Sequence, residues 1–108
     1  MSSERRVVVT GLGTVSPLGN NVDTTWANIT KGISGAASIT KFDTSEFATT
    51  FAAELKGYDE ISGLSPKEKR RIDPFVQYAL TASDQAIKDA NLSLENIDNT
   101  RIGVSIGS

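Results

Sequence analysis

The sequence predicts an α/β fold, because apolar runs typical of strands alternate with segments that have helical spacing. The first strand is predicted over residues 6–10, which include the uninterrupted run Val7–Val9, and the last over residues 101–106. Helices are expected between them, after Asn21 and again after Asp73-Pro74. An uninterrupted β-branched run is typical of a strand covered on both faces, so we expect residues 6–10 to lie in a parallel sheet.

The first helix is predicted over residues 22–31. Asn21 has a side chain suited to a helix N-cap, and Gly32 supplies a stop signal at the other end. Apolar residues recur at i, i+4 and i+7 on one face, namely Val22, Trp26 and Ile29. We therefore expect Trp26 to anchor this helix in the core.

The middle of the chain has weaker signals. Residues 34–50 are rich in Ser, Thr, Gly and Ala without regular spacing, which predicts a loop, and Phe51–Leu55 follows as a short strand. A second helix start is predicted at Ser65, which can act as N-cap before Pro66 at the first helical position. Glu68 stands three residues after the cap, where its side chain can reach back in a capping box.

The longest helix is predicted from Pro74 to about Ala90, with Asn91 as a left-handed stop. At about 100° per residue, one stripe of this helix is apolar or small: Phe75, Ala79, Ala82, Ala86 and Ala90, flanked by Val76, Leu80, Ser83 and Ile87. We expect this stripe to face the core. The opposite side is expected to face water: Gln77, Thr81, Asp84 and Lys88.

Composition limits the chemistry of these 108 residues. They contain no cysteine and no histidine, so a disulfide framework, a thiolate metal site and a histidine-activated nucleophile are excluded. The acidic residues show no metal-ligand spacing, and we predict no catalytic residue, no metal site and no cofactor. The net charge of −2 does not favour binding to nucleic acid or to an anionic membrane. No apolar run is long enough for a signal peptide or a membrane span, which predicts a cytoplasmic protein.

The glycine-rich stretch after the first strand, Gly11-Leu12-Gly13-Thr14-Val15-Ser16, has only part of a dinucleotide-binding pattern. The third glycine position is occupied by Ser16, and Pro17 follows at once, so a phosphate-facing helix start is not supported. We interpret Gly11 and Gly13 as residues needed for unusual backbone angles and close packing.

A single basic cluster, Lys67-Glu68-Lys69-Arg70-Arg71, follows the second helix start. On a helix, Lys67, Arg70 and Arg71 share one face because they stand at i, i+3 and i+4, whereas Lys69 points roughly the other way. For an isolated basic run, a solvated face without a specific partner is the commoner explanation. A nucleic-acid interface would need more positive charge and interleaved aromatic residues.

Several motifs occur together along the chain: Arg6–Gly19, Trp26, Ser34-Gly35, Phe42-Asp43-Thr44-Ser45, Lys67–Asp73 and Arg101-Ile102-Gly103. This combination resembles the β-ketoacyl-acyl-carrier-protein synthases, the condensing enzymes of fatty-acid synthesis, and most of all their synthase II branch. The resemblance implies that residues 1–108 are the N-terminal portion of the N-terminal domain of the thiolase-like five-layer αβαβα fold. It also implies that the chain is a fragment of a longer protein.

The resemblance also implies a function. The parent is expected to be an acyltransferase that elongates acyl chains by decarboxylative Claisen condensation with malonyl-carrier protein, and to be a homodimer. The family supplies its nucleophilic cysteine and two histidines from later positions, so the fragment alone is predicted to be inactive. Acyl carrier protein is expected to dock on Lys67, Arg70 and Arg71, and the remainder of the synthase is a second expected partner. The alternative is a non-catalytic α/β module that binds an acidic carrier protein.

Overall fold

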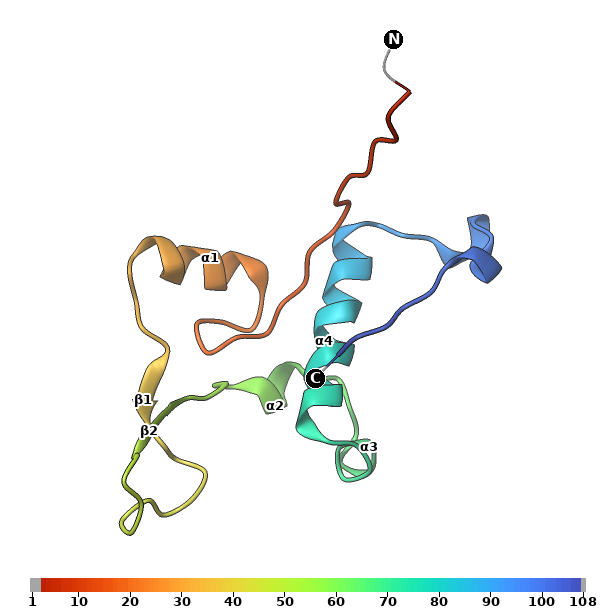
Figure 1. Cartoon of the computed structure of the whole chain (residues 1–108). Helices are drawn as coiled ribbons and strands as arrows, with labels where there is room; N and C mark the ends of the chain where they lie inside the picture. The colour runs from red at the N-terminus through yellow and green to blue at the C-terminus, as the bar shows by residue number, and fades with distance from the viewer. Residues whose placement is uncertain (1–2, 108) are drawn as a thin grey trace.

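The computed structural model describes residues 3–107 and has an open, elongated shape (Figure 1). It measures 62 × 37 × 22 Å and has a radius of gyration of 17.8 Å, whereas a compact domain of this length has about 13 Å. Its accessible surface is 8952 Å², about 3,000 Å² more than a compact protein of this mass exposes. Within residues 3–107 no hydrophobic side chain is fully buried.

The regular elements are short except for one helix. In chain order they are α1 (Val22–Thr30), β1 (Ala36–Ser38), β2 (Phe51–Ala53), α2 (Tyr58–Ile61), α3 (Pro66–Lys69) and α4 (Pro74–Asp89), followed by 3₁₀ turns at Leu94–Asn96 and Asn99–Arg101. β1 and β2 form an antiparallel hairpin in which Ala37 lies opposite Ala52. This hairpin projects to one side of the molecule, away from α4 (Figure 1).

The helix boundaries confirm the capping predictions. The Asn21 side chain accepts a hydrogen bond from the Thr24 backbone N–H at 2.8 Å, and α1 ends before Gly32, whose φ is +68°. Ser65 and Glu68 form the predicted capping box at the start of α3. After α4, Asn91 has a φ of +51°, the left-handed stop that the sequence predicted. These signals act within one or two helical turns, so they need no distant partner.

The strand predictions at the two ends of the chain are wrong. The structure has no strand in residues 6–10, and residues 101–106 continue from a 3₁₀ turn into backbone without regular structure. A strand needs a neighbour for its N–H and C=O groups, and neither segment is paired with another described segment. Val7, Val9 and Val104 are accordingly exposed. The observed sheet is a two-stranded hairpin, not the parallel sheet that was expected.

The predictions for the hairpin are partly confirmed. A strand does begin at Phe51, although it ends at Ala53 and not at Leu55. The stretch predicted as a loop, residues 34–50, contains β1, because its Ala36–Ser38 segment has β2 as a pairing partner. The alanine-rich sequence of β1 gave no strand signal of its own.

The prediction of which side of α4 is buried is only partly confirmed: the small residues Ala82, Ala86 and Ala90 of the predicted stripe pack against the glycine loop, but its large apolar side chains do not form a core. The two side chains that are buried within residues 3–107 are Gln77 and Thr81, at 8% and 9% exposure, and both belong to the side expected to face water. Phe75, on the predicted core stripe, is 51% exposed. Trp26 is 64% exposed and does not anchor α1 in a core. The Asp84–Lys88 ion pair is present at 2.6 Å on the solvent side.

Hydrogen bonds explain why the polar side of α4 is turned inward. We use "polar face" for the residues spaced by four along this helix: Gln77, Thr81, Gln85 and Asp89. Each binds a different earlier part of the chain: the α3–α4 turn, the Tyr58 hydroxyl, the backbone of Thr14 and Asn20, and the Leu12 N–H. The polar face therefore joins α4 to the rest of the molecule.

The glycine loop packs against a neighbouring side of the same helix. A Cβ atom on Gly13 would lie 2.7 Å from the Ala86 nitrogen, and one on Gly11 would lie 2.6 Å from the Ala90 nitrogen. Neither glycine has a positive φ. The close-packing part of this prediction is therefore confirmed, and the part that concerns unusual backbone angles is not.

Candidate functional site

The basic cluster lies on α3 and the turn that joins it to α4. Lys67 is inside the helix, Arg70 is its C-cap residue and Arg71 comes next, and all three are exposed. Between residues 3–107 two ion pairs form, Lys69–Asp59 and Lys88–Asp84, and neither uses these three cations. Three positive charges therefore face solvent at one corner of a chain whose net charge is −2.

Lys69 differs from the other three cations, as its helical position predicted. Its ammonium group lies 3.0 Å from the Asp59 carboxylate of α2, and its side chain is only 23% exposed. This pairing neutralises Lys69 locally and links α3 to α2. The structure thus separates an exposed set, Lys67, Arg70 and Arg71, from a cation used within the fold. We call the exposed set the basic face.

Glu68, the acidic residue within the basic cluster, is directed away from the basic face. The Glu68 carboxylate accepts a hydrogen bond from the Ser65 N–H at 2.8 Å, at the start of α3. Hydrogen bonds from the backbone N–H of Ser65 and then from its hydroxyl hold the pKa of Glu68 below its ordinary value of 4.5. Glu68 is therefore an anion at neutral pH, but its charge is engaged at the opposite end of the helix from Arg70 and Arg71.

Arg70 is held partly by its own helix. Its Nε–H donates to the Pro66 carbonyl oxygen at 3.2 Å, one turn earlier. This bond fixes the side chain along α3. An arginine fixed in this way presents a planar set of N–H donors that suits carboxylate or phosphate groups on a partner.

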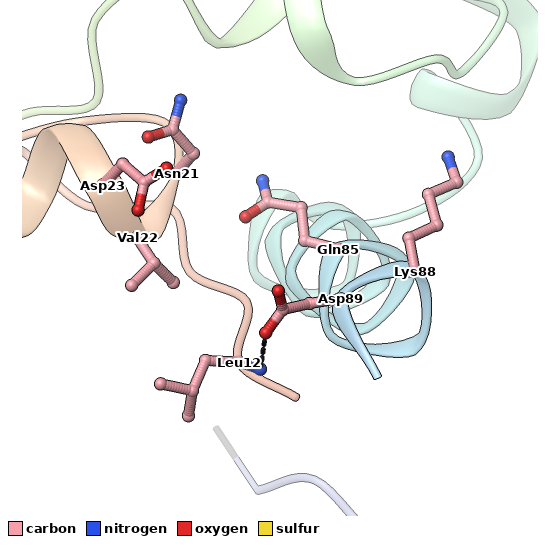
Figure 2. A pocket seen from close by; sticks show the side chains of 7 residues that line it. All are labelled: Leu12, Asn21, Val22, Asp23, Gln85, Lys88 and Asp89. Carbon is pink, nitrogen blue, oxygen red and sulfur yellow. Dashed lines mark hydrogen bonds between the residues drawn. The ribbon is translucent and has the colours of Figure 1, made fainter. Parts of the chain in front are cut away.

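A hollow lies between α1 and α4 (Figure 2). It is lined by Leu12, Asn21, Val22, Asp23, Gln85, Lys88 and Asp89. Figure 2 shows Asp89 reaching from α4 to the Leu12 backbone, whose N–H donates to its Oδ2 at 2.9 Å. Among the described residues, no group of three or more acidic side chains gathers there or elsewhere as a metal site. The hollow is a joint between the glycine loop and α4.

Sequence reasoning missed the residues that hold this architecture. Gln85 accepts from the Thr14 N–H at 3.1 Å and donates to the Asn20 carbonyl at 2.8 Å, and Gln77 binds two carbonyls near α3. The available signal was the four-residue spacing of the polar face, which the apolar stripe of the same helix obscured.

The helices found in residues 3–107 include none with the length and apolar character of a membrane span.

Comparisons with known proteins agree on one family. The sequence model described as "Beta-ketoacyl synthase, N-terminal domain" matches residues 4–108. A 3-oxoacyl-[acyl-carrier-protein] synthase 2 of Staphylococcus aureus (strain N315) is 46% identical over 108 residues, which are 100% of this chain and 26% of that protein. The protein of the same description from Vibrio cholerae is 45% identical over 106 residues, 98% of this chain and 26% of that protein.

A solved structure is similar as well. The ishigamide ketosynthase/chain length factor matches with a TM-score of 0.74 and 33% sequence identity, over 88% of this chain and 24% of that chain. The chain spans about a quarter of the length of the curated relatives it matches. The open shape of the chain is therefore similar to part of a much larger ketosynthase structure.

Proposed function

The chain belongs to the β-ketoacyl synthase family, and we propose that it is the first part of the N-terminal domain of a fatty-acid condensing enzyme, a 3-oxoacyl-[acyl-carrier-protein] synthase 2. Residues 1–108 would then begin the thiolase-like five-layer αβαβα fold. The full coverage of this chain at 46% identity supports this proposal. The reaction is the decarboxylative Claisen condensation of an acyl group with malonyl-carrier protein in fatty-acid biosynthesis.

The part of this reaction that falls to these residues is recognition of the carrier. With no cysteine and no histidine, the chain has neither the thiolate that would hold an acyl group nor the imidazoles that would stabilise the enolate. We expect these groups from the remainder of the synthase and expect this chain alone to be inactive. The basic face, Lys67, Arg70 and Arg71, is proposed to dock an acidic acyl carrier protein.

The exposed apolar surface supports packing against further chain. Phe75, Val76, Ala79 and Leu80, here called the apolar face of α4, line a groove together with Ser83, Val104 and Ile106. Exposed apolar side chains gathered in one groove favour contact with other protein. We propose that the remainder of the synthase covers it, and that the intact enzyme is a homodimer.

One observation carries the docking proposal: the basic face is exposed while the neighbouring Lys69 and Glu68 are engaged inside the fold. Charges at the rim of an interface mainly accelerate association with an oppositely charged partner. The exposure of the basic face therefore supports the proposal that an acidic carrier is steered toward α3 and the turn that follows it. The same charges would be screened by salt, because the Debye length is about 8 Å at physiological ionic strength.

Charge reversal in the intact synthase tests this proposal. The triple variant Lys67→Glu, Arg70→Glu, Arg71→Glu is expected to raise KM for malonyl-carrier protein by about 10-fold or more and to leave kcat nearly unchanged. KM for malonyl-coenzyme A, which has no carrier protein, should not change. Carrier binding by the triple variant with wild-type affinity at low salt would contradict the proposal.

A matched pair of neutral variants provides the control. Lys67→Gln and Lys69→Gln each remove one positive charge from the same four-residue helix. We expect only Lys67→Gln to weaken carrier binding, because Lys69 is paired with Asp59 and directed toward α2. Equal effects would mean that net charge, and not the basic face, attracts the carrier.

A further inference from the structure

We propose that Gln77 is a positioning residue for carrier docking, because its side-chain amide fixes the turn that presents Arg70 and Arg71. This inference rests on the proposed docking function. Gln77 lies near the start of α4 and is 8% exposed, so it does not itself contact a partner at the surface.

The geometry joins one amide group to two backbone carbonyls. Gln77 Nε2 donates to the Lys69 carbonyl oxygen at 3.0 Å and to the Ile72 carbonyl oxygen at 3.1 Å. An amide nitrogen has two N–H groups, so each carbonyl has its own donor. The orientation of the amide is also determined, since its oxygen in the same place would face two other oxygens.

The two residues that supply these carbonyls flank Arg70 and Arg71 in the sequence. Lys69 is the last residue of α3 and Ile72 stands one residue before the N-cap of α4, so the only residues between them are Arg70 and Arg71. Both ends of this short turn are therefore bound to the same buried side chain. The directions in which the two guanidinium groups leave the backbone follow from the conformation that Gln77 holds.

The helix α3 needs such a restraint. It has four residues, far fewer than an isolated helix needs for stability in water. The Arg70 and Arg71 backbone N–H groups donate to the Pro66 and Glu68 carbonyls, and the Lys69 carbonyl accepts from Gln77. At its start the capping box supplies hydrogen bonds, and at its end Gln77 supplies one to Lys69. The Lys69–Asp59 ion pair is a weaker restraint, because the Asp59 side chain is 90% exposed and the pair is screened by water.

The test is Gln77→Met in the intact synthase, which removes both N–H donors at nearly constant side-chain length. We expect KM for malonyl-carrier protein to rise by about 5- to 10-fold, as for the loss of one or two hydrogen bonds. Neither kcat nor KM for malonyl-coenzyme A should change. A residue needed only for folding would lower activity with both substrates.

Gln85→Met is the matched control. Gln85 is a glutamine two turns further along the same face of α4, and it also makes two hydrogen bonds, but to Thr14 and Asn20 and not to α3. It should leave KM for malonyl-carrier protein unchanged. An equal rise in both variants would show that any loosening of α4 weakens docking, and the role assigned to Gln77 would be wrong.

The failures of the two proposals are distinguishable. If Lys67→Ala, Arg70→Ala, Arg71→Ala leaves carrier KM unchanged, docking itself is wrong. If that triple variant raises KM and Gln77→Met does not, only the positioning role is wrong. If Gln77 acts through the basic face, Gln77→Met should add no further effect in the triple-alanine background. Should Gln77→Met fail to fold, Gln77→Asn shortens the reach by one carbon and should raise carrier KM more modestly; no rise would overturn the inference.

Discussion

Two sides of α4 differ in how the chain uses them: the polar face is hydrogen-bonded to earlier segments, whereas the large side chains of the apolar face are partly exposed. The polar face, Gln77, Thr81, Gln85 and Asp89, contacts four earlier segments of the chain, whereas on the apolar face Phe75 and Leu80 are about half exposed. In a self-sufficient domain the apolar stripe of a helix faces the core. The polar contacts therefore define how α4 is joined to the rest of this chain, and its apolar face stays partly exposed.

The two kinds of contact differ in what they contribute to stability. A hydrogen bond adds only about 0.5–1.5 kcal/mol, because it replaces a bond to water. Burial of apolar surface adds about 25 cal/mol per Å² and is the dominant favourable term in folding. The chain has many of the first kind of contact and, within residues 3–107, no fully buried hydrophobic side chain. Its hydrogen bonds therefore define how the segments are arranged, but the burial that contributes most to the free energy of unfolding is small.

The largest expected effect concerns the chain in isolation. Purified residues 1–108 should show no cooperative thermal unfolding by circular dichroism and should self-associate in sedimentation, because the apolar face of α4 and Val104 and Ile106 lack cover. The intact synthase, measured in parallel, should unfold cooperatively. A soluble monomer of the isolated chain with a sharp transition would instead favour a stand-alone module that binds an acidic carrier.

The same contrast explains which features the sequence could predict. The caps at Asn21, Ser65 and Asn91 depend on neighbours within a few residues, and each was predicted correctly. The strands at residues 6–10 and 101–106 depend on pairing partners, and no described segment provides them. Their β-branched composition indicates a strand inside a sheet, but composition cannot supply the neighbouring strand.

In the candidate site, too, features that depend on near neighbours were predicted and those that depend on distant partners were not. The exposure of Lys67, Arg70 and Arg71 and the inward direction of Lys69 agree with simple helical spacing. The four-residue spacing of the polar face was a signal that Gln77 makes contacts, but its acceptors were not predictable, because they are backbone carbonyls that any sequence possesses. Side chains that bind backbone leave no partner residue in the sequence to search for.

A substitution in the glycine loop is expected to have an effect of intermediate size on stability. It tests whether this loop packs on α4. Gly13→Ala places a methyl group 2.7 Å from the Ala86 nitrogen and 2.8 Å from Gln85 Cβ, so the loop must move away from α4. Overpacking of this kind costs about 1–3 kcal/mol. We expect a lower midpoint in urea unfolding of the intact synthase, with Gly32→Asn as the control, since Gly32 has open space around it and a left-handed φ that asparagine tolerates. No change in the midpoint for Gly13→Ala would mean that the glycine loop is not packed on the helix.

The smallest expected effect is the shift in the pKa of Glu68. Its titration tests whether the capping box forms without a hydrophobic core. The pKa of Glu68 is lowered first by the Ser65 backbone N–H and then by the Ser65 hydroxyl. A lowered pKa in the folded chain stabilises the capping box above the unfolded value, and this contribution is lost as the pH falls through the folded pKa. Carbon-detected NMR of Glu68 should therefore give a midpoint below 4.5. In Ser65→Ala the midpoint should rise only part of the way, because the backbone N–H remains.

The box spans one helical turn, so we expect the lowered value in the isolated chain as well as in the intact synthase. A midpoint of 4.5 in the isolated chain alone would mean that α3, like the missing strands, needs distant partners in order to form.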